Sequence, residues 1–444
     1  PPPPPPPPFQ AEDGIRDSVN GLVGSEMCIR DRAMPAEQLA LLPYYTNVLT
    51  ELGLGDSDYL ETQHRQSATV GSINAFTSMR GEVNNEQAIT ANLVLSSKAL
   101  LRNSDDQTAL MVDTLHNLRF NEHARIRDMI SHQRARREQS VTGNGHGLAM
   151  AAASAGMSPL AQLNHELSGL AGIRTVRRLD ESIREDASLA DLATQLEDLH
   201  AAITAMPVQL LAVAEPDQVE AVAATALNGW STVSPGTGGE PWRPSALRET
   251  RNELWVTNTQ VNFCARAYPT VPVGHPDAAA LTVLGAFLRN GYLHRAIREQ
   301  GGAYGGGASQ DSGIAAFRFY SYRDPRLCET LDDFDASIQW LREGSLEQQQ
   351  LEEAILGIIG SLDKPSSPAG EAKQHFHNRL FGRTHDQREV FRQQVLSVAM
   401  DDIRRVAETY LTPDKASTAV ITSAARRDAD SSRIEELRLS VEEL

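Results

Sequence analysis

The 444-residue chain is long enough for two or three domains, and no apolar run approaches the length of a transmembrane helix. Its formal net charge of -17 argues against a nucleic-acid partner, because phosphates demand a basic face. The same charge would steer basic peptides towards the protein, but an acidic surface also serves solubility alone. The cysteines are too few and too scattered for a disulfide scaffold or a zinc knuckle: Cys28, Cys264 and Cys328.

The N-terminal segment, residues 1–32, does not read as part of a fold. Eight prolines open it, and a proline run adopts extended polyproline II without a core. The following FQAEDGIRDSVNGLVGSEMCIRDR has no sustained period and resembles translated sequencing-adapter read-through. We therefore expect a non-native, disordered segment, comparable to a fusion scar.

Residues 33–231 mix helices and strands. Glycines from Gly143 to Gly147 predict that a strongly charged helix breaks there. The expected helices are 34–54, 59–66, 105–118, 122–138, 148–155 and 188–205, and the expected strands are 68–76, 87–97 and 208–214.

A linker over residues 232–246 is rich in proline, glycine and serine, and a second mixed block follows over 247–444. In that block a loop is expected over 366–370, and a charged tail ends the chain. The other expected elements are strands 253–257, 261–268, 314–322 and 417–422, and helices 277–298, 331–343, 346–362 and 401–410. Helices and strands that do not alternate strictly indicate an α+β class.

The most informative stretch is IREQGGAYGGGA and the strand that follows it. Gly301 and Gly302 should end the preceding helix, because glycine tolerates the left-handed cap. The glycine run after Tyr304 allows three interpretations. It is a simple cap and reversal, a phosphate loop, or a peptide groove with Arg298 and Tyr304 beside an open strand edge. The phosphate interpretation is weak, because such a loop precedes a helix rather than following one.

This stretch, together with SYRDP after it, closely resembles the C-terminal half of the presequence-protease branch of the insulinase/pitrilysin metallopeptidases. LLPYYTNVLTELG, DYLETQHRQSATVGSINA and GHGLAMAAASAGMSPLAQLNHELSGLAGI echo that family's third domain, and YPTVPVGHPDAAAL its fourth. The resemblance implies two insulinase-family-like domains, at 33–231 and 247–444. Each would be a mainly antiparallel sheet with helices packed on it, and together they would form half of a clamshell.

The resemblance also implies roles for the site residues. Tyr304 would donate a hydrogen bond to the oxyanion or to a nearby substrate carbonyl, and Arg298 would grip a substrate carbonyl or hold Tyr304. Gly305, Gly306 and Gly307 would let the substrate approach the backbone. From the residues alone, Arg298 could equally be a cation at a helix C-terminus, and Tyr304 could be core packing.

The zinc motif of the family is missing from this chain. No H-x-x-E-H or H-E-x-x-H occurs among its 12 histidines. The best local group, Glu371 one turn before His375 with His377 nearby, more often marks a wet helix surface than a metal site. We therefore expect zinc to be a cofactor of the intact enzyme, held by an N-terminal half that this chain lacks. This chain alone should bind no metal and should be inactive.

The resulting expectation is the C-terminal half of a zinc metalloendopeptidase that degrades unfolded, presequence-like peptides in a closed chamber. Its partners would be the peptide and the zinc-bearing half, without nucleic acid or membrane. The compartment is cytoplasmic if the source is bacterial, or the mitochondrial matrix if it is eukaryotic. Two alternatives remain: a non-catalytic subunit of a two-chain protease, and a structural or assembly protein of the same fold. Tyr304 and Arg298 together speak against the last of these.

Overall fold

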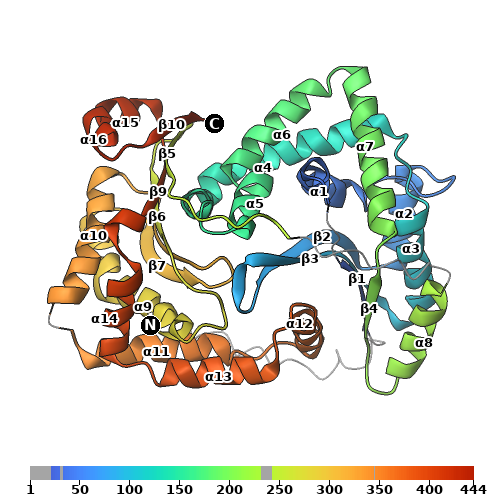
Figure 1. The fold of residues 1–444 in the computed structure, drawn as a ribbon. Coiled ribbons are helices and arrows are strands. Elements are labelled where there is room, and N and C mark those ends of the chain that lie inside the picture. Colours follow the sequence, from blue (N-terminus) through green and yellow to red (C-terminus); the bar gives the residue numbers. More distant parts are fainter. Residues whose placement is uncertain (1–21, 31–33, 232–242, 345) are drawn as a thin grey trace, which may run out of the picture.

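The computed structural model describes residues 22–30, 34–231, 243–344 and 346–444. Two sheets with helices packed against them form the molecule, which confirms the expected α+β class (Figure 1). The first is a four-stranded antiparallel sheet with the order β2-β3-β1-β4. Its strands are β1 (Leu22–Arg30), β2 (Ser72–Glu82), β3 (Asn85–Leu100) and β4 (Val208–Val213).

Helices surround the four-stranded sheet and bury a core that includes Tyr45, Leu95 and Leu196. Two of them begin at side-chain caps. The Asp58 carboxylate accepts the Glu61 amide, and the Ser158 hydroxyl accepts that of Ala161. The helices are α1 (Ala36–Val48), α2 (Tyr59–Thr69), η2 (Leu101–Asn103), α3 (Ser104–His116), α4 (His123–Ser154), α5 (Pro159–Ser168), α6 (Leu170–Ser182), α7 (Asp186–Thr204) and α8 (Val219–Trp230).

Strand β1 corrects the expectation that residues 1–32 stay outside the fold. Leu22–Arg30 lies between β3 and β4 and pairs antiparallel with both. The pairing satisfies backbone groups of β3 and β4 that would otherwise face no strand. Residues 1–21 and 31–33 lie outside the described residues.

Helix α4 corrects a second expectation. The chain does not leave the helix at residues 143–147 but kinks there, with Asn144 at φ -131° and ψ 28°. Tertiary packing holds both arms of the helix. Its second arm, with α5 and the start of α6, covers one face of the second sheet and forms a core that includes Ala149, Trp255, Phe263 and Ile421.

The second sheet has six strands in the order β10-β5-β9-β6-β8-β7. Strand β5 pairs in parallel with β9 and β10, and the other pairs are antiparallel. The strands are β5 (Asn252–Val256), β6 (Phe263–Pro269), β7 (Gly305–Asp311), β8 (Ala316–Tyr322), β9 (Ser417–Thr422) and β10 (Ser440–Glu443).

A second layer of helices covers the face of this sheet opposite α4, around a core that includes Phe287, Phe319 and Phe334 (Figure 1). The helices of this part of the chain are α9 (Asp277–Leu288), η3 (Arg289–Gln300), α10 (Cys328–Glu343), α11 (Gln348–Leu362), α13 (His385–Leu396), α14 (Met400–Tyr410), η4 (Pro413–Lys415), α15 (Ala424–Ala429) and α16 (Ser431–Glu436). Helix α12 (Pro368–Leu380) instead lies against the first sheet, where Lys373 and His377 bind Glu26 of β1 (Figure 1).

The loop expected over residues 366–370 ends at Ser367, and residues 368–370 are instead the start of α12. Ser367 caps this helix by accepting the Gly370 amide, and Pro368 occupies its first turn, where proline needs no hydrogen-bond partner. The charged tail likewise forms α15, α16 and β10. Serine and proline in this segment therefore begin a helix.

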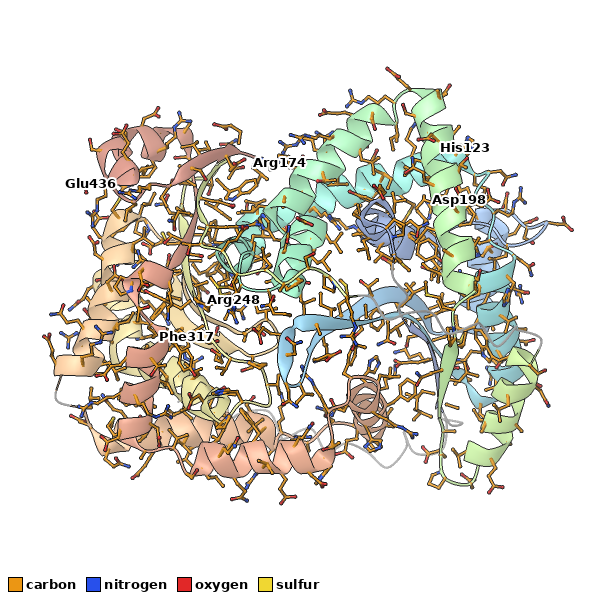
Figure 2. All side chains as sticks on the ribbon, viewed as in Figure 1. His123, Arg174, Asp198, Arg248, Phe317 and Glu436 are labelled. Atoms are coloured by element: carbon orange, nitrogen blue, oxygen red, sulfur yellow. The ribbon has the colours of Figure 1, made fainter. Side chains whose placement is uncertain are left out.

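The two sheets contact each other through the β2–β3 hairpin. The Arg248 guanidinium binds the Glu86 carboxylate at 2.5 Å, and the Gly274 amide donates to the Val83 carbonyl at 2.7 Å. Figure 2 shows Arg248 between the hairpin and the sheet that carries Phe317. Most of the expected linker, 232–242, lies outside the described residues, so the domain boundaries stay a prediction.

Candidate functional site

The segment that leads to Arg298 is a wide helix. Helix α9 continues directly into η3, a π-helix, and Ile297 near its end is fully buried. π-Helical turns are rare in proteins, and those that occur often lie at functional sites. The expected glycine cap is present, since Gly302 has φ +79° and its amide donates to the Arg298 carbonyl at 3.1 Å.

Tyr304 stands on the surface immediately before β7. Its side chain is 69% exposed, which excludes the interpretation as core packing. Its amide donates to the Tyr322 carbonyl at 3.1 Å, and the two rings meet edge to face with centroids 5.6 Å apart. The backbone is therefore fixed by β8, while the phenol remains free to meet a ligand.

The glycine run forms the first residues of β7, the outermost strand of the six-stranded sheet. One edge of β7 consequently pairs with no other strand in the described structure, as a peptide groove requires. Gly306 is fixed by packing, because a Cβ there would lie 2.7 Å from the Ile297 side chain. A Cβ on Gly305 would meet nothing within 4 Å, so this glycine leaves open space on the surface.

Arg298 is exposed in the last turn of η3, and its Nη1 lies 3.5 Å from Nε2 of His294. It forms no ion pair and no hydrogen bond with Tyr304 among the described residues. Its place in the last turn suits the helix dipole, as the structural interpretation expects. Arg298 therefore does not hold Tyr304 in this structure, and its contact is with His294 on the same helix.

Sequence reasoning missed a contribution from the first domain. The kink of α4 places His146 against β8, with its ring 4.8 Å from that of Tyr322 and 5.7 Å from that of Tyr320. The Tyr322 hydroxyl donates to the Gly143 carbonyl at 3.4 Å. His146 thus contacts the ring on which Tyr304 rests. The glycines around His146 were a signal for this close approach, but they suggested only a break.

Zinc ligands do not gather at any one place in the described part of the chain. Among the described residues, no group of three or more histidine, cysteine, aspartate or glutamate side chains could hold a metal ion. His377 instead lies 3.0 Å from the Glu26 carboxylate. No helix in the described ranges is long and apolar enough to cross a membrane.

Family models match both parts of the chain. A model for the region associated with peptidases of family M16, subfamily C, matches residues 16–179, and the "PreP C-terminal domain" model matches residues 252–425. The chain corresponds to the C-terminal half of a presequence-protease-like protein. The first match starts within the segment that was expected to be non-native, and it includes β1.

Curated relatives agree with the family models. Mitochondrial presequence protease of Yarrowia lipolytica is 29% identical over 405 residues, covering 88% of this chain and 39% of the relative. Presequence protease 1 of Arabidopsis thaliana, chloroplastic/mitochondrial, is 26% identical, covering 92% and 38%. The chain spans about two fifths of the length of these relatives.

Solved structures share the fold at low sequence identity. A protease from Helicobacter pylori has a TM-score of 0.62 at 14% identity, covering 91% of this chain and 95% of that one. A peptidase M16 inactive domain from Pseudomonas fluorescens has a TM-score of 0.62 at 16% identity, covering 92% and 93%. The arrangement of two sheets therefore occurs in chains of similar extent.

Proposed function

We propose that this chain is the substrate-binding half of a zinc metalloendopeptidase that cleaves unfolded peptides inside a closed chamber. The observation that carries the proposal is the exposed phenol of Tyr304 at the open edge of β7. In the intact protein, residues outside this chain would hold the zinc, which polarises a carbonyl and activates water. The names of the curated relatives support a peptide as substrate.

The chain's own contribution is to bind and orient the peptide. An extended peptide can pair with the free edge of β7, and the missing side chain of Gly305 leaves room beside it. The Tyr304 hydroxyl would donate a hydrogen bond to the oxyanion that forms when the peptide carbonyl is attacked. A preorganised donor of this kind contributes roughly 3 kcal/mol to barrier lowering. Arg298 would hold a neighbouring carbonyl, since its guanidinium carries five donors.

The test combines this chain with the zinc-bearing half that the proposal expects. Tyr304→Phe should lower kcat for a fluorogenic peptide by about 100-fold or more, because one oxyanion donor is lost. Tyr59→Phe is the matched control, because Tyr59 lies on α2 and its ring packs against Arg125. An unchanged kcat in Tyr304→Phe with normal folding would remove Tyr304 from the mechanism.

The source gene distinguishes the alternatives. An in-frame upstream extension with H-x-x-E-H supports a single-chain protease. A separate zinc-bearing partner supports a two-chain enzyme. If no zinc-bearing half exists and the chain binds no peptide, the proposal is wrong and a structural role takes its place.

A further inference from the structure

The described residues contain a group of cations without acidic partners, far from Tyr304 in sequence. Helices α11, α12 and α13 and the tip of the β2–β3 hairpin enclose two adjoining hollows of about 980 and about 500 Å³. Both hollows are lined by Arg383 and Arg388, and the larger one also by Lys364 and Arg379. None of these four side chains forms an ion pair among the described residues, although the chain carries a net charge of -17.

Arg383 is the central residue of this cleft. It is half-buried, and its Nε is buried without a hydrogen-bond partner in the described structure. Burial, and then the like charge of Arg80, lower the pKa of Arg383. The Arg80 guanidinium itself packs on the ring of Phe381 at 5.2 Å. Asp311, the carboxylate whose charge reaches Arg383, pairs with Arg318 at 3.0 Å. An unpaired donor beside a second guanidinium favours an anion between or near them.

The carboxylates that line the cleft do not neutralise it. Asp363 lines it but is held by Arg392 through contacts of 2.7 to 3.1 Å. Glu371 and Asp386 also line the hollows and form no ion pair among the described residues. With Asp363 neutralised, four cations face two free carboxylates, so the cleft keeps a net positive charge.

The smaller hollow adds an apolar wall to this charge. Val83, Val273, Leu362, Val390 and Phe391 line it together with Arg383. Val390 is 55% exposed, so its side chain is accessible to a ligand in this hollow. An apolar wall beside a guanidinium suits a ligand with an apolar group next to an anionic end.

We propose that this cleft captures the C-terminal carboxylate of a peptide whose last residue is apolar, with Arg383 on the carboxylate and Val390 and Phe391 on the side chain. Carboxylate capture at a chain end is a known mode of peptide recognition. The inference rests on the proposed peptide-binding function. It adds a second anchor that is separate from Tyr304.

The test measures fluorescence anisotropy of short neutral peptides, labelled at the N-terminus and ending in leucine, with the full 444-residue chain. The free carboxylate should bind about 10-fold more tightly than the C-terminal amide, the size expected for a hydrogen bond to a charged group. Arg383→Gln should abolish that preference, and Arg383→Lys should restore part of it. Arg433→Gln is the control of equal charge change, because Arg433 lies on α16 and pairs with Asp332 on α10, away from the cleft (Figure 1).

A second variant tests the apolar wall. Val390→Ser should weaken the binding of a peptide ending in leucine by a few-fold and leave the binding of one ending in glycine unchanged. Because Val390 is exposed, the substitution should not unfold the chain. Equal binding of carboxylate and amide, or a preference that survives Arg383→Gln with native circular dichroism, would overturn the inference. Tyr304→Phe should not alter the carboxylate preference, so failure of this site and failure of the proposed function can be told apart.

Discussion

At the scale of single residues, the adjacent glycines Gly305 and Gly306 of β7 differ in the space around them. Gly306 has no room for a side chain because Ile297 fills the space, whereas Gly305 faces open space. Gly305→Val should therefore leave the stability nearly unchanged but weaken peptide binding several-fold, because a branched side chain would project into the groove. Gly306→Val should lower stability by about 1–3 kcal/mol through overpacking.

Urea denaturation and peptide anisotropy on both variants separate these effects. The expected pattern is loss of binding with retained stability at Gly305 and loss of stability at Gly306. If Gly305→Val binds peptide as well as the unmodified chain, the substrate does not run along this face of β7.

His165 makes stability depend on pH. It is 3% exposed, packs edge to face on Trp255, and its pKa is lowered to about 4 by burial and by the charges of Arg251 and Arg174. In the unfolded chain His165 takes up a proton near pH 6.5, whereas in the folded chain it stays neutral down to about pH 4. The free energy of unfolding is therefore highest above pH 6.5 and falls as the pH drops towards 4. The pKa difference corresponds to roughly 3 kcal/mol.

His165→Phe keeps the ring contact and removes the titration. Chemical denaturation at several pH values should show a shallower loss of stability between pH 6.5 and 4 than in the unmodified chain. His64→Phe is the matched control for the substitution itself, because His64 is exposed and lies outside this core. Parallel profiles for all three proteins would contradict this account.

At the scale of elements, local sequence predicted the type of most helices and strands but not what long-range packing decides. Ser367 and Pro368 carry the signature of a helix start, yet the short polar stretch before them suggested a loop. β1 could not be predicted, because its pairing partners lie about 70 and 180 residues away and its sequence has no period. The contact of His146 with Tyr322 depends on how β8 meets the kinked α4, which local sequence cannot show.

Strand β1 is itself testable. It separates β3 from β4, so its removal takes away the strand neighbour of β4. A chain that starts at Met34 should therefore lose hydrogen-exchange protection in Val208–Val213, while β6 keeps its protection. Unchanged protection of β4 would show that residues 1–33 are dispensable, as expected of a non-native segment.

The kink of α4 offers a matched pair of glycines. A Cβ on Gly145 would lie 2.5 Å from the ring of Phe263, whereas one on Gly143 would meet nothing within 4 Å. Gly145→Ala should therefore destabilise the chain by about 1–3 kcal/mol through overpacking. Gly143→Ala should be neutral or stabilise by up to about 1 kcal/mol, because alanine is the better helix former. The urea unfolding midpoints of the two variants measure this difference. Equal effects of the two substitutions would mean that α4 does not pack closely against β6 at Gly145.

At the scale of the whole molecule, the two sheets are joined by a core that neither block builds alone. Leu148, Ala149 and Ala152 come from α4, and Trp255, Phe263 and Ala419 come from the six-stranded sheet. The Arg174–Glu442 ion pair, 2.6 Å long, adds a polar contact between the same two blocks. A core shared in this way couples the unfolding of both parts.

We therefore expect a single cooperative transition. Hydrogen exchange followed by mass spectrometry through a urea series should give coincident midpoints for β3, in the first sheet, and β6, in the second. Gly145→Ala alters the shared core, so it should lower both midpoints by the same amount. Two separate midpoints, or a Gly145→Ala effect confined to β6, would mean that the blocks fold independently and that α4 is only docked on the second sheet. Coincident midpoints would instead make the placement of His146 beside Tyr322 a property of the native state as a whole, because α4 could not leave β8 without unfolding both sheets.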